Sequence, residues 1–308
     1  MMWRLLKMNW LKNKKIVITH DGNFHPDDVF AVATISLLND GKIKVIRSRD
    51  YSLYEKADYV LDTGDVYDPA NDRFDHHQEG GAGKRDNGIS YSTFGLVWQK
   101  YGEQLCGSKN IAKIVDNELV EVIDADDCGF ELSDSRLRDV QPFLMVDVIY
   151  DYSPTWKEDD SKIYDLFMGR VEFAKELLAR RIKVWQDKIE AGSLVDKIYK
   201  NTADKRVIVF DQVGIPKSLL YKYPEPLFVV YPNRGTPMWR VKTLEKDETT
   251  IECRKNFPKS WWGKRDEDLA KVCGVSDATF VRNTGIFGGA KSKEGALKMA
   301  ELAVNNKE

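Results

Sequence analysis

All four histidines of this 308-residue chain lie in two short segments that are rich in aspartate. The first segment covers residues 20–28 and the second covers residues 75–77. Structural histidines scattered through a fold would not be expected to group in this way. Neutral imidazole together with carboxylate oxygen suits Mn²⁺, Fe²⁺ or Zn²⁺ better than Ca²⁺. The two segments therefore predict a site for divalent metal ions.

The candidate ligands outnumber what one ion needs, which indicates two ions. They are His20, Asp27, Asp28, Asp62, His76, His77, Asp124 and Asp127. Two ions about 3.5–4 Å apart can activate a water and hold both the attacking and the leaving oxygen of a phosphate. One carboxylate must bridge them, and we expect Asp62 to do so. The alternatives are a His-His pair on the surface by accident, a helix cap at residues 27–28 and a solvated helix end at residues 124–127.

The elements that position these residues follow a strand–helix–strand order. Apolar, β-branched runs at residues 15–19, 43–46 and 59–61 predict strands, and residues 29–38 predict a buried helix. This order indicates a parallel sheet, whose site lies where the strands end. His20 and Asp62 each follow one of these strands. Further helices are expected at residues 93–101 and 111–123, and one or two amphipathic helices at residues 161–191.

The pattern changes after Gly192. Short strands are expected at residues 207–210, 227–231 and 239–244, and helices at residues 266–272 and 294–304. We therefore expect an α/β protein of two domains. Residues 15–192 would form a domain with a parallel sheet, the candidate metal ligands and a helical linker. Residues 193–308 would form a smaller α+β domain.

The second half has its own features that suit phosphate. Gly285, Gly288 and Gly289 precede the last predicted helix, and glycine permits close backbone approach while a helix N-terminus favours anions. Basic residues flank the pair Trp261-Trp262, and they are Arg254, Lys255, Lys259, Lys264 and Arg265. Basic and aromatic side chains together suit single-stranded nucleic acid. The alternative is that the tryptophans are buried in a core and the basic residues are solvated surface.

Composition sets outer limits on function. The formal net charge of −2 argues against nucleic-acid binding by a bulk positive field, and 42 % apolar residues are ordinary for a globular protein. The four cysteines form no C-x-x-C pair, so a zinc ribbon is excluded and reduced thiols are expected. No apolar run approaches the roughly 20 residues of a membrane span. We expect a cytoplasmic protein; the basic first fifteen residues leave organellar targeting, or a start at Met8, as alternatives.

Three segments in this order resemble successive motifs of the DHH phosphoesterase superfamily. They are ITHDGNFHPDDVFAVA, DYVLDTGDVYDPANDRFDHHQ and VEVIDADDCG. The match is nearest to the branch of the melanocyte-proliferating-gene proteins, which are manganese-dependent exonucleases. The segment FPKSWWGKRDEDLAKVCGVSDATFVRNTGIFGGAKSKEGALKMA is similar to the end motif of that branch. The resemblance runs from about Lys15 to Val304, nearly the whole chain.

The resemblance implies a DHH-type catalytic domain, a linker and a substrate-gripping C-terminal domain. It implies metal ligands from four motifs. They are His20, Asp27 and Asp28 of the first motif, Asp62 of the second, His76 of the third (residues 75–77), and Asp124 and Asp127 of the fourth. It places Asp75 and His77 in catalysis, and His77 would orient or protonate the phosphate. We expect His25 to contact substrate; whether it also ligates metal, and which of Asp27 and Asp28 does so, stays open.

One position departs from that branch. Where the branch usually has histidine ahead of the final glycines, this chain has Arg282. Arginine can still grip a phosphate through two parallel hydrogen bonds, but it cannot transfer a proton at neutral pH. The substrate-binding set is therefore expected to be His25, Arg254, Lys264, Arg265, Arg282, Gly285, Gly288 and Gly289.

Together these features predict a two-metal phosphodiester hydrolase that uses Mn²⁺, with Mg²⁺ as an alternative. Its expected substrate is single-stranded RNA or a short oligonucleotide, cut from an end in the 3′–5′ direction. One rival is the same chemistry on a small substrate, such as a cyclic dinucleotide or pyrophosphate. Another rival is a non-enzymatic regulatory protein that binds nucleic acid. No membrane partner is expected, and an oligomer is left open.

Overall fold

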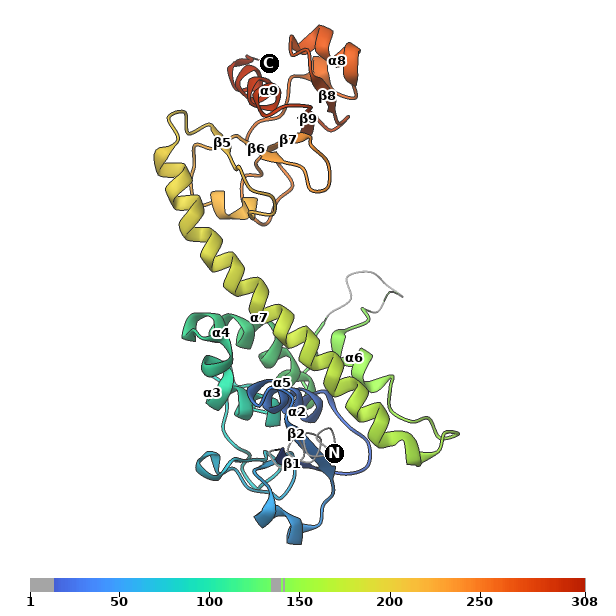
Figure 1. Cartoon of the computed structure of the whole chain (residues 1–308). Coiled ribbons are helices and arrows are strands. Elements are labelled where there is room, and N and C mark those ends of the chain that lie inside the picture. The colour runs from blue at the N-terminus through green and yellow to red at the C-terminus, as the bar shows by residue number, and fades with distance from the viewer. Residues whose placement is uncertain (1–13, 134–139, 141, 308) are drawn as a thin grey trace, which may run out of the picture. The chain divides into compact units, whose positions relative to one another are not determined.

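The computed structural model describes residues 14–133, 140 and 142–307 of the chain (Figure 1). The basic N-terminal stretch that we considered as a targeting segment lies almost entirely outside these residues. The chain divides into two compact units, Met1–Gln186 and Asp187–Glu308. Within the described ranges, the structure contains no helix long and apolar enough to cross a bilayer.

The first unit is built on a four-stranded sheet with the order β2-β1-β3-β4, and all its pairings are parallel. The strands are β1 Lys15–Thr19, β2 Ile43–Arg47, β3 Tyr59–Leu61 and β4 Arg73–Phe74. From β1 the chain passes to β2 on one side, and β3 then pairs with β1 on the other. In open parallel sheets, ligands bind at such a change of direction, beyond the carboxyl ends of the strands. The α/β class and the parallel sheet are as predicted.

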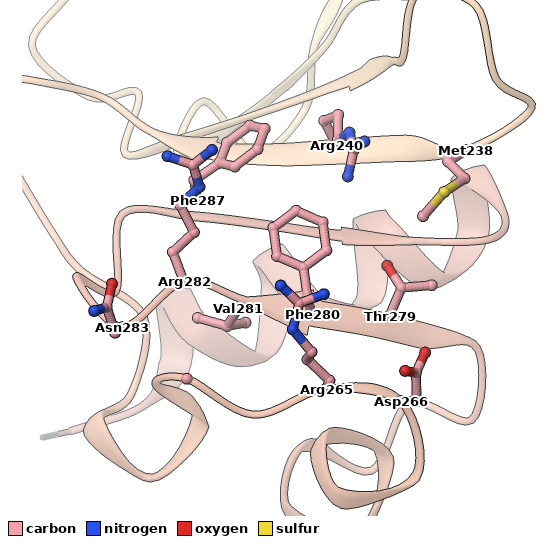
Figure 2. A pocket seen from close by; sticks show the side chains of 11 residues that line it. Met238, Arg240, Arg265, Asp266, Thr279, Phe280, Val281, Arg282, Asn283 and Phe287 are labelled. Atoms are coloured by element: carbon pink, nitrogen blue, oxygen red, sulfur yellow. The ribbon is translucent and has the colours of Figure 1, made fainter.

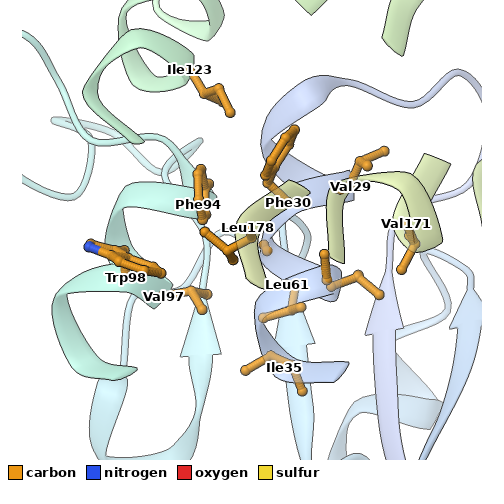
Figure 3. Close-up of a cluster of buried hydrophobic side chains, with 14 of the residues drawn as sticks. Val29, Phe30, Ile35, Leu61, Phe94, Val97, Trp98, Ile123, Val171 and Leu178 are labelled. Atoms are coloured by element: carbon orange, nitrogen blue, oxygen red, sulfur yellow. The ribbon is translucent and has the colours of Figure 1, made fainter. Parts of the chain in front are cut away.

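Helices α2 (Pro26–Leu38), α3 (Thr93–Cys106) and α7 (Ile163–Asn201) pack around one core with the sheet (Figure 3). Phe30 of α2 and Phe94 of α3 meet with ring centroids 5.3 Å apart, and neither side chain is exposed. Burial of such a side chain contributes about 1.5–3 kcal/mol. This packing explains the apolar run in α2, because a helix that is covered on most faces has no polar stripe.

Three further α-helices of the first unit are described, and one of them, α5 (Glu121–Asp127), carries most of the motif VEVIDADDCG. The others are α4 Lys109–Val115 and α6 Met145–Tyr150, with a π-helical turn at Asp116–Val120 between α4 and α5. The predicted helix at residues 111–123 is therefore two helices joined by an irregular turn. Such turns are common at functional sites. Here the turn precedes the helix that ends at Asp127.

Helix α7 contributes residues to both units. The sequence predicted that it would end at Gly192, but it continues to Asn201. One glycine costs a helix only about 1 kcal/mol, and the good helix formers around it outweigh that cost. A functional division near residue 192 stays a prediction.

The second unit contains a five-stranded mixed sheet with the order β5-β6-β7-β9-β8. Its strands are β5 Val207–Val209, β6 Phe228–Pro232, β7 Trp239–Thr243, β8 Ala278–Val281 and β9 Phe287–Ala290. Helices α8 (Asp266–Cys273) and α9 (Lys293–Asn305) share its core. The sequence predicted the first three strands and both helices, but not β8 and β9. Each of these strands has only four residues, and two of the four in β9 are glycines, so no regular apolar alternation marks them.

Candidate functional site

Strand pairing brings His20 and Asp62 together. Because Thr19 pairs with Leu61 in neighbouring parallel strands, the residues that follow them lie side by side. Nε2 of His20 lies 3.1 Å from Oδ2 of Asp28 and 3.2 Å from Oδ2 of Asp62. The other ring nitrogen, Nδ1, donates to the carbonyl of Asp21 at 2.8 Å. In a neutral ring this contact leaves the lone pair of Nε2 facing the two carboxylates, as a metal ligand requires.

The third motif joins the same edge of the sheet. Leu61 pairs with Phe74, which places residues 75–77 next to Asp62. Nε2 of His76 lies 3.4 Å from Oδ1 of Asp62 and 3.3 Å from Oδ2 of Asp127 at the end of α5. It lies 3.9 Å from Oδ2 of Asp27 in the first turn of α2. We call the set His20, Asp27, Asp28, Asp62, His76 and Asp127 the metal centre.

Asp62 lies between the two histidines of this centre. Its Oδ2 faces His20, and its Oδ1 faces His76. Its backbone has a φ of 55°, the left-handed region that few residues other than glycine adopt. Burial raises the pKa of this carboxyl, but the imidazoles of His20 and His76 hold the pKa below its ordinary value. A charged carboxylate with its two oxygens on opposite sides is the arrangement that a bridging ligand needs.

Each of the remaining carboxylates of the metal centre has one oxygen without a hydrogen bond within the described ranges. Several buried side-chain atoms of the described residues have no hydrogen bond, and four of them belong to the metal centre: Nε2 of His20, Oδ1 of Asp27, Oδ2 of Asp28 and Oδ2 of Asp127. Burial raises the pKa of Asp27, and neighbouring carboxylates raise it further. Buried polar atoms without partners are costly, and divalent cations would supply the missing interactions. The donor set therefore fits divalent ions with mixed nitrogen and oxygen ligation.

The pKa values of the two histidines in the metal centre are also raised. Burial lowers the pKa of His20, but interactions with the carboxylates of Asp28 and Asp62 outweigh burial and raise the pKa to about 10. Burial lowers that of His76, while Asp62 and Cys128 raise it to about 10. In the absence of cations, these rings provide positive charge for the carboxylates. Metal binding would release those protons, because a ligating imidazole must be neutral.

Asp75 holds His77 in place beside the metal centre. Its Oδ1 accepts from Nδ1 of His77 at 2.8 Å and from the His77 amide at 3.1 Å, and its Oδ2 accepts from the Asp65 amide at 2.7 Å. The hydrogen bond to Asp75 raises the pKa of His77. The His77 side chain is 55 % exposed and borders a cavity of about 280 Å³, together with Arg49 and Tyr51. His77 can therefore reach a molecule in that cavity.

Two further residues offer potential ligand atoms near the metal centre; whether His25 ligates metal was left open by the sequence, and Cys128 was not considered. His25, expected on the substrate, offers a ring nitrogen to two groups of potential ligands: one with His20 and Asp62, the other with Asp27 and Asp127. Cys128, which the sequence reasoning missed, offers its sulfur within a third group, with His76 and Asp127. Its position next to Asp127 was the one available signal.

Asp124 is not brought together with the other candidates. Its Oδ1 accepts from the amide and hydroxyl of Ser92 and from the amide of Gly95, at 2.7–3.2 Å. Its Oδ2 accepts from Nε and Nη2 of Arg85 at 2.9 and 2.6 Å. Both oxygens are thus occupied by hydrogen bonds, and we leave Asp124 out of the metal centre. Spacing alone could not separate it from Asp127, because α5 carries both.

The second unit has a pocket of about 930 Å³ between β7, β8, β9 and the start of α8 (Figure 2). Three guanidinium groups pack against two phenylalanine rings in it. Arg240 lies 5.0 Å from the centroid of Phe280, Arg265 lies 5.9 Å from the same centroid, and Arg282 lies 5.4 Å from that of Phe287. We call these five residues the arginine–phenylalanine pocket. Arg265 and Arg282 were among the predicted substrate-binding residues. Arg240 was not, although its strand β7 was predicted. Phe280 and Phe287 lie on β8 and β9, which the sequence did not predict.

Other predicted substrate residues have structural contacts instead. Arg254 donates to backbone carbonyls, which belong to Tyr221, Tyr223, Pro226 and Lys246. Lys264 is half-buried, and its backbone carbonyl accepts from the Val281 amide, but it does not line the pocket.

The three predicted glycines, Gly285, Gly288 and Gly289, do not form a loop at the N-terminus of α9. Gly288 and Gly289 lie inside β9, where a Cβ would approach the carbonyls of Phe280 and Trp239 to 2.9 and 2.8 Å. Gly285 has a φ of 67°, and a Cβ there would collide with Trp262. These glycines allow strands and a tryptophan ring to pack closely. The helix N-terminus is instead capped by Ser292.

Comparison with known proteins gives a match over nearly the whole chain. The model of an uncharacterised protein family, UPF0160, which carries the name MYG1_exonuc, matches residues 16–304. A MYG1 protein of Caenorhabditis elegans is 28% identical over 324 residues, covering 94% of this chain and 95% of that protein. The human MYG1 exonuclease is 27% identical, covering 93% of this chain and 85% of its own length.

Among solved structures, RecJ of Thermus thermophilus with Mg²⁺ aligns to 98% of this chain and 52% of its own. The identity is 12% and the TM-score is 0.28, so this likeness carries no argument here. The wider DHH resemblance continues to depend on the motifs, whereas the family match covers both units. The chain therefore belongs to the MYG1 exonuclease family, the branch that its motifs resembled.

Proposed function

We propose that this protein is a metal-dependent exonuclease that hydrolyses phosphodiester bonds of single-stranded RNA or short oligonucleotides. Family membership and the names of the relatives support a nuclease of the hydrolase class. The observation that carries the proposal is the position of Asp62, whose two carboxylate oxygens face His20 on one side and His76 on the other.

Two sets of ligands divide around Asp62. His20 and Asp28 lie next to its Oδ2, and would hold one ion. His76 lies next to its Oδ1 and also approaches Asp27 and Asp127, a set that would hold a second ion. Mixed imidazole and carboxylate ligation suits Mn²⁺, and Mg²⁺ is the alternative. When bound, such ions supply an activated water and neutralise the charge that develops on a phosphate.

His77 and Asp75 act on the substrate side of the centre. Because Asp75 accepts from Nδ1 of His77, the ring is oriented and its protonated form is stabilised. A protonated His77 can donate Nε2–H to a non-bridging phosphate oxygen or to the leaving oxygen. The adjoining cavity of about 280 Å³ is at the small end of the range for ligand pockets, which favours one terminal nucleotide over a duplex.

The arginine–phenylalanine pocket would bind the polymer. Guanidinium groups can bind phosphate through two hydrogen bonds, and aromatic rings can stack on bases without regard to sequence. Its lining contains three arginines and one acidic residue, Asp266, so a positive patch exists in a chain of net charge −2. This charge favours a nucleic-acid strand over an uncharged small substrate.

Hydrolysis of end-labelled oligomers tests the function. We expect Mn²⁺ to support stepwise removal of nucleotides from single-stranded RNA, and EDTA to stop it. Oligomers blocked at the 3′ end should be resistant, while those blocked at the 5′ end should be cut. Cleavage of pyrophosphate or a cyclic dinucleotide alone would favour the small-substrate alternative. Binding without any metal-dependent hydrolysis would instead favour a regulatory protein.

A further inference from the structure

The N-terminus of α3 contacts carboxylates from three separate segments. The helix begins at Thr93, after the N-cap residue Ser92. The amide of Thr93 donates to Oδ2 of Asp27 at 3.3 Å, and its hydroxyl donates to Oδ1 of Asp62 at 3.0 Å. None of the three side chains is appreciably exposed. Thr93 therefore contacts two members of the metal centre without itself offering a good metal ligand.

The hydroxyl contact restricts the carboxylate of Asp62. The backbone of Asp62 is left-handed, and its amide donates to the carbonyl of Phe74 at 2.9 Å. These contacts fix the backbone but leave the side chain to rotate. A hydrogen bond from Thr93 to Oδ1 supplies an anchor on the side that faces His76. Hydrogen bonds of this kind orient metal-ligating carboxylates, and their loss typically lowers metal affinity or activity 10–100-fold.

Asp124 holds the helix end that carries Thr93. Ser92 does not cap α3 with its own hydroxyl; instead it donates that hydroxyl to Oδ1 of Asp124 at 2.7 Å. The same oxygen accepts from the Gly95 amide at 3.1 Å, which is the bond that an N-cap side chain usually makes. Gly95 has no room for a Cβ, which would collide with this carboxylate. Asp124 is thus a cap supplied by α5.

Arg85 holds the carboxylate of Asp124 in place. It donates to Oδ2 of Asp124 and, at 2.8–3.0 Å, to both oxygens of Asp116. The pair is buried, with side-chain exposures of 6% for Arg85 and 0% for Asp124. A buried pair of this geometry has little freedom to rearrange. The first turn of α3 is therefore fixed independently of any ion.

We propose that Thr93 is a positioning residue that sets the orientation of the Asp62 and Asp27 carboxylates, and that Asp124 acts through the start of α3 to hold Thr93. The inference rests on the proposed function, because it assigns Asp62 and Asp27 to metal binding. It gives Asp124 a role in the same site that does not require contact with an ion.

Isosteric substitution of Thr93 tests this role. Thr93→Val removes the hydroxyl and keeps the shape, while Thr93→Ser keeps the hydroxyl. We expect Mn²⁺ affinity, measured by titration calorimetry on the full chain, to fall about 10–100-fold in Thr93→Val and to stay near wild type in Thr93→Ser. The effect on hydrolysis should appear in kcat at subsaturating Mn²⁺, with little change in KM for the oligomer.

Thr34→Val is the matched control, because Thr34 is also a fully buried threonine of the first unit, whose hydroxyl donates to the Phe30 carbonyl at 2.7 Å. It should bind Mn²⁺ like wild type. Melting in EDTA reports any general loss of fold. Two results together would overturn the inference and show that Thr93 has a packing role. The first is a Thr93→Val chain that melts far below the Thr34→Val chain. The second is a Thr93→Ser chain that binds Mn²⁺ as weakly as Thr93→Val.

Asp124→Asn tests whether Asp124 acts on the metal centre through Thr93. The amide oxygen can still accept from Ser92 and Gly95, but the charge opposite Arg85 is lost. We expect Mn²⁺ affinity to fall, and the effect to be less than additive with Thr93→Val, because both act on one contact. Strict additivity would overturn the action of Asp124 through Thr93.

The outcomes separate the inference from the function on which it rests. A wild-type chain that binds no Mn²⁺ would overturn the proposed function and the inference with it. A wild-type chain that binds Mn²⁺, with Thr93→Val binding equally well, would overturn the inference alone.

Discussion

The metal centre and the arginine–phenylalanine pocket differ in how the chain builds them. The metal centre collects residues at the ends of adjacent parallel strands and at two helix termini. Four of its six residues are buried, and His76 and Asp127 are half-buried. The pocket collects side chains from one face of a mixed sheet, and Arg265 and Arg282 are exposed. Substitution of a buried metal ligand should strongly reduce activity. Substitution of one exposed arginine should remove only part of the affinity for a nucleic-acid strand, because the other arginines remain. The two regions should therefore respond to mutation on different scales.

The largest effect is expected from Asp62→Asn. An amide is a much weaker bridging ligand than a carboxylate, so turnover should fall about 1,000-fold, or about 4 kcal/mol of barrier. Rates of RNA hydrolysis at saturating Mn²⁺ measure this. Asp58→Asn, on an aspartate that pairs with Lys15 just ahead of β3, is the matched control and should retain near-normal activity. Retention of more than about a tenth of the rate in Asp62→Asn, about 1.4 kcal/mol, would place the bridge elsewhere.

The next effect concerns stability of the first unit. Arg85→Met removes one partner of a buried ion pair and leaves the Asp124 charge uncompensated, at a cost of about 3 kcal/mol. Urea unfolding, monitored by the hydrogen exchange of amides in each unit, measures this loss of stability. Amides of the first unit should lose protection, while those of β6 and β9 should not. Equal loss in both units would mean that the two do not respond separately.

Metal removal should act on the same unit. If cations supply the partners that the buried carboxylates lack, Mn²⁺ at about 100 times its Kd stabilises the first unit by about 2.7 kcal/mol. Melting curves with Mn²⁺ and with EDTA test this, and Asp62→Asn should show a smaller shift. An unchanged melting curve in wild type would argue against a cation at the buried carboxylates.

The smallest effect is expected in the arginine–phenylalanine pocket. Arg282→Ala should raise KM for an RNA oligomer about tenfold, or about 1.4 kcal/mol, and leave kcat and Mn²⁺ content unchanged. The KM of wild type should also rise with salt, and less steeply in the variant, because fewer phosphate contacts remain. Lys271→Ala, on an exposed lysine of α8 outside the pocket, controls for loss of one charge. Identical kinetics for Arg282→Ala and wild type would remove Arg282 from the substrate site.

The same contrast explains what the sequence could predict. His20 and Asp62 were found because apolar strands end just before them, and parallel strands bring such ends together. Residues 75–77 were found from their histidines and aspartate and from the order of the motifs, because the two-residue strand β4 ahead of them was not predicted. The family assignment followed from the order of these motifs and is confirmed by the family match. For the metal centre, local pattern and three-dimensional position therefore agree.

The sequence was least informative where position depends on long-range contacts. Asp124 and Asp127 lie on one short helix, and only the contacts of Arg85 and Ser92 with Asp124 distinguish them. Strands β8 and β9 have no apolar alternation, so Phe280, Phe287 and the packing role of Gly288 were not visible. Thr93 carries no signal of its own, because a threonine at the start of a helix is common.

Anomalous diffraction at the manganese absorption edge, from crystals of the full chain soaked in Mn²⁺, tests the central claim most directly. The account predicts two peaks in the first unit, one between His20 and Asp28 and one between His76 and Asp127, with Asp62 contacting both. A single ion that does not touch Asp62, no ion at all, or ions bound within residues 187–308 would contradict it.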